Sequence, residues 1–302
     1  MKIVGITLGP ILETISESRK IYEVANASAF FSTFMYEFLK KVSSSKNYEI
    51  ITPHFNETEK NERKLYPDRA ILKVNEEKRK NLEDKDIVEE IENLKEQVFE
   101  KLKKNLEDSL KEKKISFKDF EKINEIIKGN KIYLLKEYIN FNVVIMNVEK
   151  SEEIKKIFSK LDGIELIKNF PIQYNEKEIN EVIANSLDKI KLKEKDFSVN
   201  ENNYRAIISL DLDNMGKFSQ EEIEKIKDVS VRIHNYISKL KEFIESKKRN
   251  EKSEGLVLYS AGDDILAILN PKYILEFIER ALFNFSIAKR SFSSNISILA
   301  SS

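Results

Sequence analysis

Two short acidic segments in the C-terminal third of the chain carry the residues best suited to chemistry. The first is Asp211-Leu212-Asp213-Asn214-Met215-Gly216-Lys217, and the second is Tyr259-Ser260-Ala261-Gly262-Asp263-Asp264. Each follows an apolar, β-branched run, Ala206–Leu210 in one case and Leu256–Leu258 in the other. Each segment therefore presents carboxylates at the end of a predicted strand. Converging carboxylates of this kind are typical of a site for divalent metal ions.

Four carboxylates at one place repel one another unless cations lie between them, and hard oxygen ligands select Mg²⁺ or Mn²⁺ rather than zinc. Two such ions about 4 Å apart can activate a ribose hydroxyl and hold a leaving pyrophosphate, which is the chemistry of nucleotidyl transfer. We expect Asp211, Asp213, Asp263 and Asp264 to bind the metal, and Asp211, Asp263 and Asp264 to be catalytic. The alternative is that the first pair forms an ordinary turn or helix cap and the second an ordinary hairpin.

The stretch between the acidic segments is predicted to be a crossover helix. Its apolar residues recur every three or four positions: Ile223, Ile226, Val229, Ile233, Ile237, Leu240 and Ile244. A tight turn at Ala261-Gly262 is then expected to lead into the strand Ile265–Leu269, with Asp263 and Asp264 at the tip of the hairpin.

A second helix and a last strand complete the pattern. Pro271 is a good helix-start residue, and a helix is expected over Ile274–Ile287. Its predicted apolar side consists of Leu275, Ile278, Leu282 and Phe285. Ile296–Leu299 alternates like a strand, so the order is βαββαβ, which is that of a ferredoxin-like palm domain.

The first 75 residues are expected to form a partner palm. Ile3–Leu8 is a β-type run that Gly9-Pro10 ends, and short strands are plausible at Tyr48–Ile51 and Ala70–Leu72. A helix is predicted from Glu13 onward, with these residues mostly on one side: Ile15, Ile21, Tyr22, Ala25, Phe30, Phe34 and Phe38. The alternative is an ordinary α+β domain, because no carboxylate cluster occurs here.

The middle of the chain is predicted to be largely helical. A helix over Asp86–Lys111 has one apolar stripe, formed by Ile87, Ile91, Leu94, Val98, Leu102, Leu106 and Leu110. Phe117–Ile127 is a candidate short helix, and Tyr138–Met146 a candidate strand. A capped helix over Ser151–Leu161 and a strand over Ile164–Ile167 follow. Asn200–Asn203 is the expected boundary before the acidic half.

The predicted fold class is therefore α+β, with two ferredoxin-like (βαββαβ) palm domains and an inserted helical segment. We expect residues 1–80 to be the N-terminal part of the first palm and residues 81–130 to be the helical insertion. Residues 131–200 would hold the remainder of the first palm and connecting helices, and residues 201–302 the second palm with both acidic motifs.

Composition excludes several function classes. The 302 residues include 41% apolar and 34% charged residues, and 52 Lys and Arg balance 52 Asp and Glu, so net charge gives no overall attraction to nucleic acid. The absence of cysteine excludes disulfides and thiolate zinc sites. A histidine-aspartate nuclease needs several clustered ligands, whereas this chain has only His54 and His234, neither followed by Asp. No membrane-spanning run or signal peptide is recognised, so a cytoplasmic protein is expected.

Asp-Leu-Asp-Asn-Met-Gly-Lys followed by a Gly-Asp-Asp hairpin resembles the second palm of the large subunit of type III CRISPR effector complexes, the Cas-ten family, particularly its Cmr-two branch. The N-terminus is similar to the opening of that branch, with Ile3–Pro10, Ile15, Ser18-Arg19-Lys20 and Ala27-Ser28. Pro67-Asp68-Arg69 stands where the family commonly has Pro-Asn-Arg. The resemblance covers the first 75 residues and the C-terminal 100.

This resemblance implies synthesis of cyclic oligoadenylates from ATP in antiviral defence, switched on when the complex binds target RNA. The implied partners are the other effector subunits, guide RNA and target RNA. Asp211 and Asp263 would bridge or flank two Mg²⁺ ions, with Asp213 and Asp264 completing the shell. The implied nucleotide contacts are Ser260, Ala261, Gly262, Lys217, Gly9, Arg19 and Lys20, although Lys217 is equally well explained as a surface lysine.

Three departures from the family pattern keep other functions open. The chain lacks the cysteine-ligated zinc element of many relatives, has Ala261 where the family has Gly, and ends at Ser302, where relatives continue with further helices. One alternative is a non-catalytic palm scaffold or a truncated remnant of the large subunit. A third reading is a stand-alone nucleotidyl cyclase of the diguanylate or adenylate type, against which the matched N-terminus argues.

Overall fold

The computed structural model of the protein describes residues 1–16, 18, 20–57, 66–76, 83–111, 132–149, 151–168, 176–187, 192, 205–213, 223–249, 252–262, 264–288 and 293–301. Within these ranges, no helix is both long enough and apolar enough to cross a membrane.

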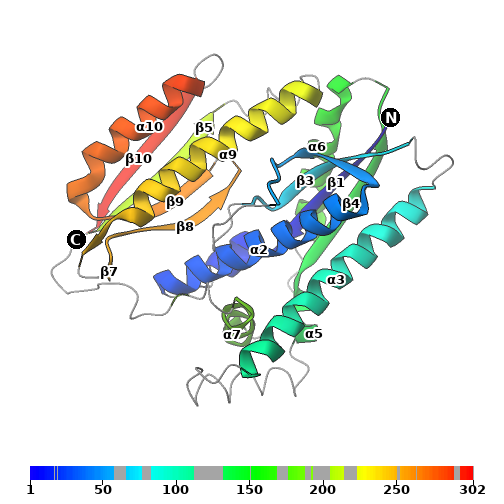
Figure 1. The fold of residues 1–302 in the computed structure, drawn as a ribbon, viewed down its shortest axis with the longest axis horizontal. Helices are drawn as coiled ribbons and strands as arrows, with labels where there is room; N and C mark the ends of the chain where they lie inside the picture. Colours follow the sequence, from blue (N-terminus) through cyan, green and yellow to red (C-terminus); the bar gives the residue numbers. More distant parts are fainter. Residues whose placement is uncertain are drawn as a thin grey trace.

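Four antiparallel strands form the first sheet, in the spatial order β2-β3-β1-β4 (Figure 1). They are β1 (Lys2–Gly9), β2 (Tyr48–Thr52), β3 (Arg69–Val74) and β4 (Asn140–Asn147). Along the chain, α2 (Ile21–Ser45) connects β1 to β2, and α3 (Asp84–Lys111) lies between β3 and β4. This connectivity and strand order make a ferredoxin-like βαββαβ unit, which confirms the prediction.

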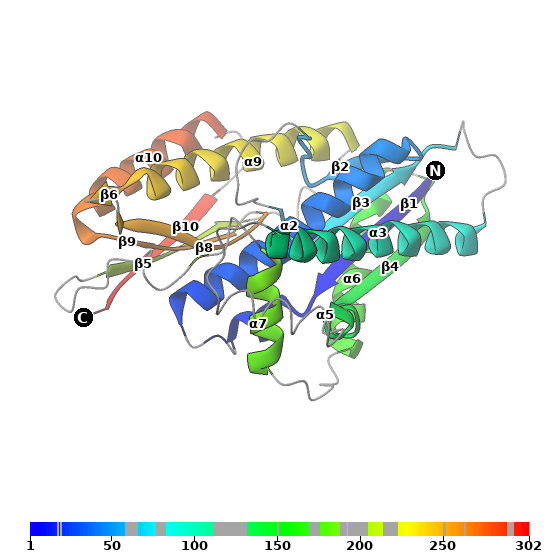
Figure 2. The same ribbon diagram turned by 60° about the horizontal axis from the view of Figure 1, so that its bottom comes forward.

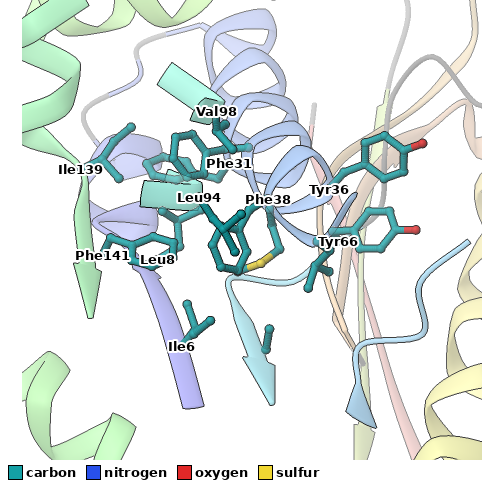
Figure 3. Packing of buried hydrophobic residues seen from close by; sticks show 14 of the residues in the cluster. Ile6, Leu8, Phe31, Tyr36, Phe38, Tyr66, Leu94, Val98, Ile139 and Phe141 are labelled. Atoms are coloured by element: carbon teal, nitrogen blue, oxygen red, sulfur yellow. The ribbon is translucent and has the colours of Figure 1, made fainter. Parts of the chain in front are cut away.

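Aromatic side chains of α2 fill the core on one face of the first sheet (Figure 3). The ring of Phe34 lies 5.1 Å from that of Phe99 on α3, and the ring of Phe38 lies 5.0 Å from that of Phe141 on β4, both edge-on. Two further helices contribute to this core, α5 (Ile132–Tyr138) and α7 (Glu176–Ser186). Full burial of each such ring stabilises the fold by roughly 2–3 kcal/mol.

The helix predicted from Glu13 onward is in fact two helices, α1 (Ile11–Ser16) and α2. The hydroxyl of Ser16 donates to the Glu13 carbonyl and that of Ser18 to the Thr14 carbonyl. Such local bonds compete with the helical ladder and help to end α1. The predicted buried side is correct from Ala25 onward but wrong at Ile21, which is 43% exposed in the first turn of α2.

The helix predicted over Asp86–Lys111 is confirmed as α3. The first five residues of its predicted stripe are buried: Ile87, Ile91, Leu94, Val98 and Leu102. The side chains of Leu106 and Leu110, the candidate helix Phe117–Ile127 and the boundary Asn200–Asn203 lie outside the described residues.

The strand predicted over Ile164–Ile167 is wrong, because these residues belong to α6 (Lys155–Lys168). This helix follows a 3₁₀ turn, η1 (Ser151–Ile154), and packs on the opposite face of the first sheet from α2. Ile157 and Leu161 on α6 are buried there, and Ile164 continues the same helical spacing. A short apolar run such as Ile164–Ile167 fits either element until packing decides.

The second sheet repeats the topology of the first, in the order β10-β5-β9-β8. Its strands are β5 (Arg205–Asp213), β8 (Gly255–Ala261), β9 (Asp264–Leu269) and β10 (Ser293–Ser301). The crossover helix is α9 (Ile223–Ser246), and α10 (Ile274–Ala288) connects β9 to β10 after a 3₁₀ turn, η4 (Pro271–Tyr273). A small ladder of β6 (Lys248–Arg249) and β7 (Lys252–Ser253) precedes β8. The predicted second βαββαβ unit is confirmed.

The predicted apolar side of α10 is wrong at Leu275 and Leu282, which are 76% and 52% exposed. It is correct at Ile278, which packs against the second core, and the side chain of Phe285 lies outside the described residues. Phe277 and Ala281 are buried against α9 and the sheet. The apolar residues of α10 form a wide arc opposite its charged residues, so periodicity alone does not select which part of the arc is buried. The large ring of Phe277 packs near Phe243 of α9, with ring centroids 6.4 Å apart.

The start of α2 covers part of the open face of the second sheet (Figure 1). Val24 and Ala25 of α2 pack against Leu256 and Leu258 of β8 and against Ile268 of β9. The rest of α2 belongs to the first core, so this helix has side chains in both halves of the chain.

The start of α9 makes the reciprocal contact with the first sheet (Figure 2). Ile223 and Ile226 of α9 pack with Ile3, Ile51 and Ile71 of the first sheet, on the face that α6 also covers. The later turns of α9 belong to the second core. The two sheets are thus held together by two crossover helices that each span the junction.

A pair of substitutions on α10 tests its orientation. We expect Phe277→Ala to lower the free energy of unfolding by about 3–5 kcal/mol, because the ring is fully buried. Leu275→Ala, two residues away and exposed, should change it by less than about 0.5 kcal/mol. Urea unfolding of both variants measures the difference. A larger loss at Leu275 than at Phe277 would show that the helix is rotated relative to this description.

Candidate functional site

The two predicted acidic segments meet at one end of the second sheet. Leu210 of β5 pairs with Ile265 of β9, so the next step of the same antiparallel register sets Asp211 opposite Asp264. Asp211 is exposed and Asp264 is half-buried. Asp213 ends β5 and pairs with Ser293 of β10, and its side chain lies outside the described residues.

The hairpin that carries the second segment closes one residue later than predicted. Ala261 pairs with Asp264, and Gly262 lies in the turn after Ala261. Gly262 has a φ of 61°, in the left-handed region that favours glycine. Asp263 lies outside the described residues, so its position relative to Asp211 stays a prediction.

Strand register assigns the site residues to the two faces of the second sheet. Directly paired residues point to the same side, and Ser260 pairs with Ile265, which is buried among the helices. Ala261, Asp264 and Asp211 therefore lie on the opposite face, toward the start of α2. The Ser260 hydroxyl is buried without a hydrogen-bond partner among the described residues, on the helix side. We call the face that holds Asp211 and Asp264 the carboxylate face. Any contact from Ser260 to a ligand on the carboxylate face would come from its backbone.

The candidate residues of the first half are less completely placed. Gly9 ends β1 with open space beside its Cα. Lys20 is exposed at the start of α2, and its backbone N–H donates to the Glu23 carboxylate at 3.1 Å. Arg19 and Lys217 lie outside the described residues, so their roles as nucleotide contacts stay predictions.

The described side chains hold part of the predicted metal-ligand set: they include Asp211 and Asp264 but neither Asp263 nor the side chain of Asp213. Among these described side chains, no three or more of His, Asp or Glu lie close enough together to hold a metal. Two carboxylates at adjacent strand ends fit the oxygen donors that Mg²⁺ or Mn²⁺ prefers.

Pro67 of the first half lies beside the hairpin loop. A Cβ added to Gly262 would lie 3.8 Å from the Cβ of Pro67. Pro67 is held in place by its neighbours: the Tyr66 carbonyl accepts a bond from the Ser32 hydroxyl at 3.0 Å, and the Asp68 carbonyl accepts one from the Leu8 N–H at 2.8 Å. In the sequence, only the resemblance of Pro67-Asp68-Arg69 to a family motif points to Pro67. The spacing of apolar residues gives no indication that Pro67 lies beside Gly262.

An ion pair between Glu49 of β2 and Lys227 of α9 links the two halves. The hydrogen bond from Lys227 lowers the pKa of the Glu49 carboxyl, because it favours the charged form more than burial disfavours it. Burial alone would lower the pKa of Lys227, but the bonds to Glu49 and Glu224 outweigh it and raise that pKa. The pair fastens the first turns of α9 to β2, and α9 is the next described element after β5 in the chain.

Substitution of Gly262 tests the loop geometry. We expect Gly262→Ala to lower the free energy of unfolding by about 1–2 kcal/mol, because a left-handed backbone strains a residue with a Cβ. The contact with Pro67 adds little, since 3.8 Å is an ordinary van der Waals distance. Gly9→Ala is the control, with open space around the new methyl group and an expected change below about 0.5 kcal/mol. Equal effects in chemical unfolding would contradict the assigned turn.

The Glu49–Lys227 pair predicts a pH dependence. Since the pKa of Glu49 in the folded protein lies below its ordinary 4.5, its stabilising effect is present above pH 4.5 and is lost as the pH falls through the lowered pKa. Thermal unfolding should show that Glu49→Gln lowers the free energy of unfolding by less than about 1 kcal/mol at pH 7, because the carboxylate is partly exposed. In acid, the same substitution should not lower it. Glu224→Gln, which removes the more exposed partner of the same lysine, should have a smaller effect at pH 7.

The second sheet and its helices match a known family. Residues 204–301 match the family model described as "Cas10/Cmr2, second palm domain". Among curated proteins, none matches the chain.

Solved structures of CRISPR proteins share the fold of the whole chain. A Csm1-Csm4 subcomplex in the type III-A CRISPR-Csm interference complex has a TM-score of 0.55 and 11% identity, over 100% of this chain and 50% of that one. A Csm1-Csm4 cassette with AMPPNP has a TM-score of 0.54 and 11% identity, with the same coverage. A cassette with pppApApA has a TM-score of 0.54 and 12% identity, over 100% of this chain and 49% of that one. The chain spans about half the length of the structures that it matches. Residues 204–301 are therefore similar to the second palm domain of the Cas10/Cmr2 family, and the chain as a whole shares the fold of these Csm1-containing structures.

Proposed function

We propose that this chain acts as the large subunit of an RNA-guided type III CRISPR antiviral effector complex and makes cyclic oligoadenylates from ATP. The observation that carries the proposal is the register that sets Asp211 and Asp264 opposite each other at one end of the second sheet. Structures of the same fold were solved with AMPPNP, with one ATP, with pppApA and with cA4, which supports a nucleotide ligand on this architecture.

In this proposal, the four carboxylates Asp211, Asp213, Asp263 and Asp264 hold Mg²⁺ or Mn²⁺ on the face of the sheet turned toward α2. Bound ions of this kind lower the pKa of an attacking 3′-hydroxyl and neutralise charge on a leaving pyrophosphate. The carboxylates position the reacting groups between them. Gly262 has no side chain and so lets the triphosphate approach the backbone closely, and Lys217 is proposed to reach the phosphate oxygens.

The junction of the two halves completes the proposed pocket. The carboxylate face of the second sheet is bounded by α2 and by Pro67, both from the first half. Gly9 ends β1 and Lys20 immediately precedes α2, so these two residues, together with Arg19 beside Lys20 in the sequence, are proposed to contact the nucleotide from this side. We place the domain limits at residues 80, 130 and 200, as expected from the sequence.

The proposed partners are the other effector subunits, together with guide and target RNA. The structures with the same fold contain Csm1 with Csm4, which supports assembly with a second subunit of that kind. The balanced charge of this chain leaves RNA recognition to the assembled complex. A cytoplasmic location is part of the proposal.

The double variant Asp263→Ala/Asp264→Ala tests the proposal. We expect product formation to fall at least about a hundredfold, because the ions lose ligands that supply several kcal/mol of transition-state stabilisation. The matched control is Glu242→Ala/Glu279→Ala, which removes two exposed carboxylates of the same half and should leave activity within about twofold. Both variants should keep the unfolding temperature within a few degrees of the wild type.

The assay incubates the chain with ATP or GTP and Mg²⁺, with and without effector subunits and target RNA, and separates the products by chromatography. RNA-stimulated synthesis from ATP alone supports the proposal. Conversion without RNA indicates a stand-alone cyclase instead. A wild-type protein that is silent under all conditions would indicate a non-catalytic scaffold. A double Asp variant as active as the wild type would reject the metal-binding assignment of Asp263 and Asp264.

A further inference from the structure

A buried asparagine of α2 binds the chain where it passes from the first half to the second. Asn26 lies in the second turn of α2 and is 1% exposed. Leu192 lies between α7 and β5, in the stretch that joins the two halves, and it is the one residue of 188–204 that the structure describes. The two residues are 166 positions apart in the chain, so their contact is a tertiary one.

Two hydrogen bonds join the side-chain amide of Asn26 to the backbone of Leu192. The Asn26 Nδ2 donates to the Leu192 carbonyl at 3.0 Å, and the Leu192 N–H donates to the Asn26 Oδ1 at 2.9 Å. A neighbouring strand binds a residue in the same way when two residues of an antiparallel pair exchange both backbone bonds. The amide offers a donor and an acceptor side by side, which no apolar or ionised side chain of similar size does.

The side chain of Leu192 packs on the carboxylate face of the second sheet. It lies against a buried apolar cluster at the start of α2 and on the sheet, formed by Ala25, Leu256, Leu258 and Ile268. Ile268 is on the same side of β9 as Asp264, because alternate residues of a strand share a face. Leu192 and the start of α2 therefore cover an apolar part of this face, on the same sheet surface as the acidic end.

Polar pairing and apolar packing both contribute to this contact, and they can be separated. Leu192 is half-buried, so its side chain gains from leaving water. Asn26 is almost fully buried, so its amide would lose more from an absent partner than a bond on the surface would. An apolar side chain of similar size at position 26 keeps the packing and removes both hydrogen bonds.

We propose that Asn26 is a positioning residue that fixes the connection between the two halves over the carboxylate face. It acts through Leu192: the amide holds the backbone of this residue, and the Leu192 side chain is thereby kept beside the start of α2. The connection is thus attached to the same helix that bounds the proposed pocket. Any effect of Asn26 on nucleotide chemistry rests on the function proposed above, whereas the attachment of Leu192 does not.

A second buried side chain of α2 binds a distant backbone in a similar way and offers a matched control. The Ser32 hydroxyl, on a residue that is 4% exposed, donates to the Tyr66 carbonyl at 3.0 Å and accepts from the Tyr66 N–H. Tyr66 lies between β2 and β3, within the first half. Loss of either side chain therefore removes two hydrogen bonds between α2 and a distant segment, but only Asn26 binds the connection between the halves.

Hydrogen exchange of the full chain, read at single backbone amides, tests the proposal. The variants are Asn26→Leu, which keeps the size of the side chain, and Asn26→Ala, which does not. In both, we expect the Leu192 amide to exchange at least about tenfold faster than in the wild type, because its acceptor is gone. The Tyr66 amide should stay within about threefold of the wild type, because its own acceptor is unchanged.

Ser32→Ala should give the reverse pattern, with a faster Tyr66 amide and a Leu192 amide within about threefold of the wild type. A Leu192 amide that stays protected in Asn26→Leu, whether or not Asn26→Ala exposes it, would show that packing holds the connection and would overturn the proposal. Equal exposure of the Leu192 amide in Ser32→Ala and in the Asn26 variants would overturn it as well. Because the measurement uses no nucleotide, a failure here is distinct from a failure of the catalytic proposal.

Discussion

Each sheet in this protein has apolar residues on both faces, and the need to cover both faces is the constraint on which the rest of the structure depends. In each half, the crossover helix covers one face, and the first turns of the other half's crossover helix cover part of the second face, which in the first half α6 also covers. The carboxylate ends of β5 and β9 lie on the face that α2 partly covers. The candidate site is therefore formed at the junction.

Much of this arrangement could be predicted from the sequence, because apolar residues recur at characteristic intervals in strands and amphipathic helices. The spacing of Ile233, Ile237, Leu240 and Ile244 predicts a helix that belongs to the second core, as observed. The sequence predicts the acidic segments at strand ends, and the strand register sets Asp211 and Asp264 opposite each other at one end of the second sheet. The metal-binding and catalytic roles of the four aspartates stay predictions, since Asp263 lies outside the described residues.

The remaining features could not be predicted, because packing between distant segments decides them. Nothing in the spacing of α10 distinguishes a buried Phe277 from an exposed Leu275, because both lie on one wide apolar arc of the helix. The run Ile164–Ile167 is short enough for either a strand or a helix, and only its packing on the first sheet selects the helix. Pro67 with Gly262 and Asn26 with Leu192 are neighbours that lie far apart in the chain, for which one sequence holds no signal.

The helix α9 has buried side chains in two cores, Ile223 and Ile226 in one and Ile233 to Ile244 in the other. A continuous helix cannot melt at one end without weakening the frame of the other. We therefore expect the two palms to unfold together in spite of their repeated topology. Dividing the gene between them would leave each product with an uncovered apolar surface prone to aggregation.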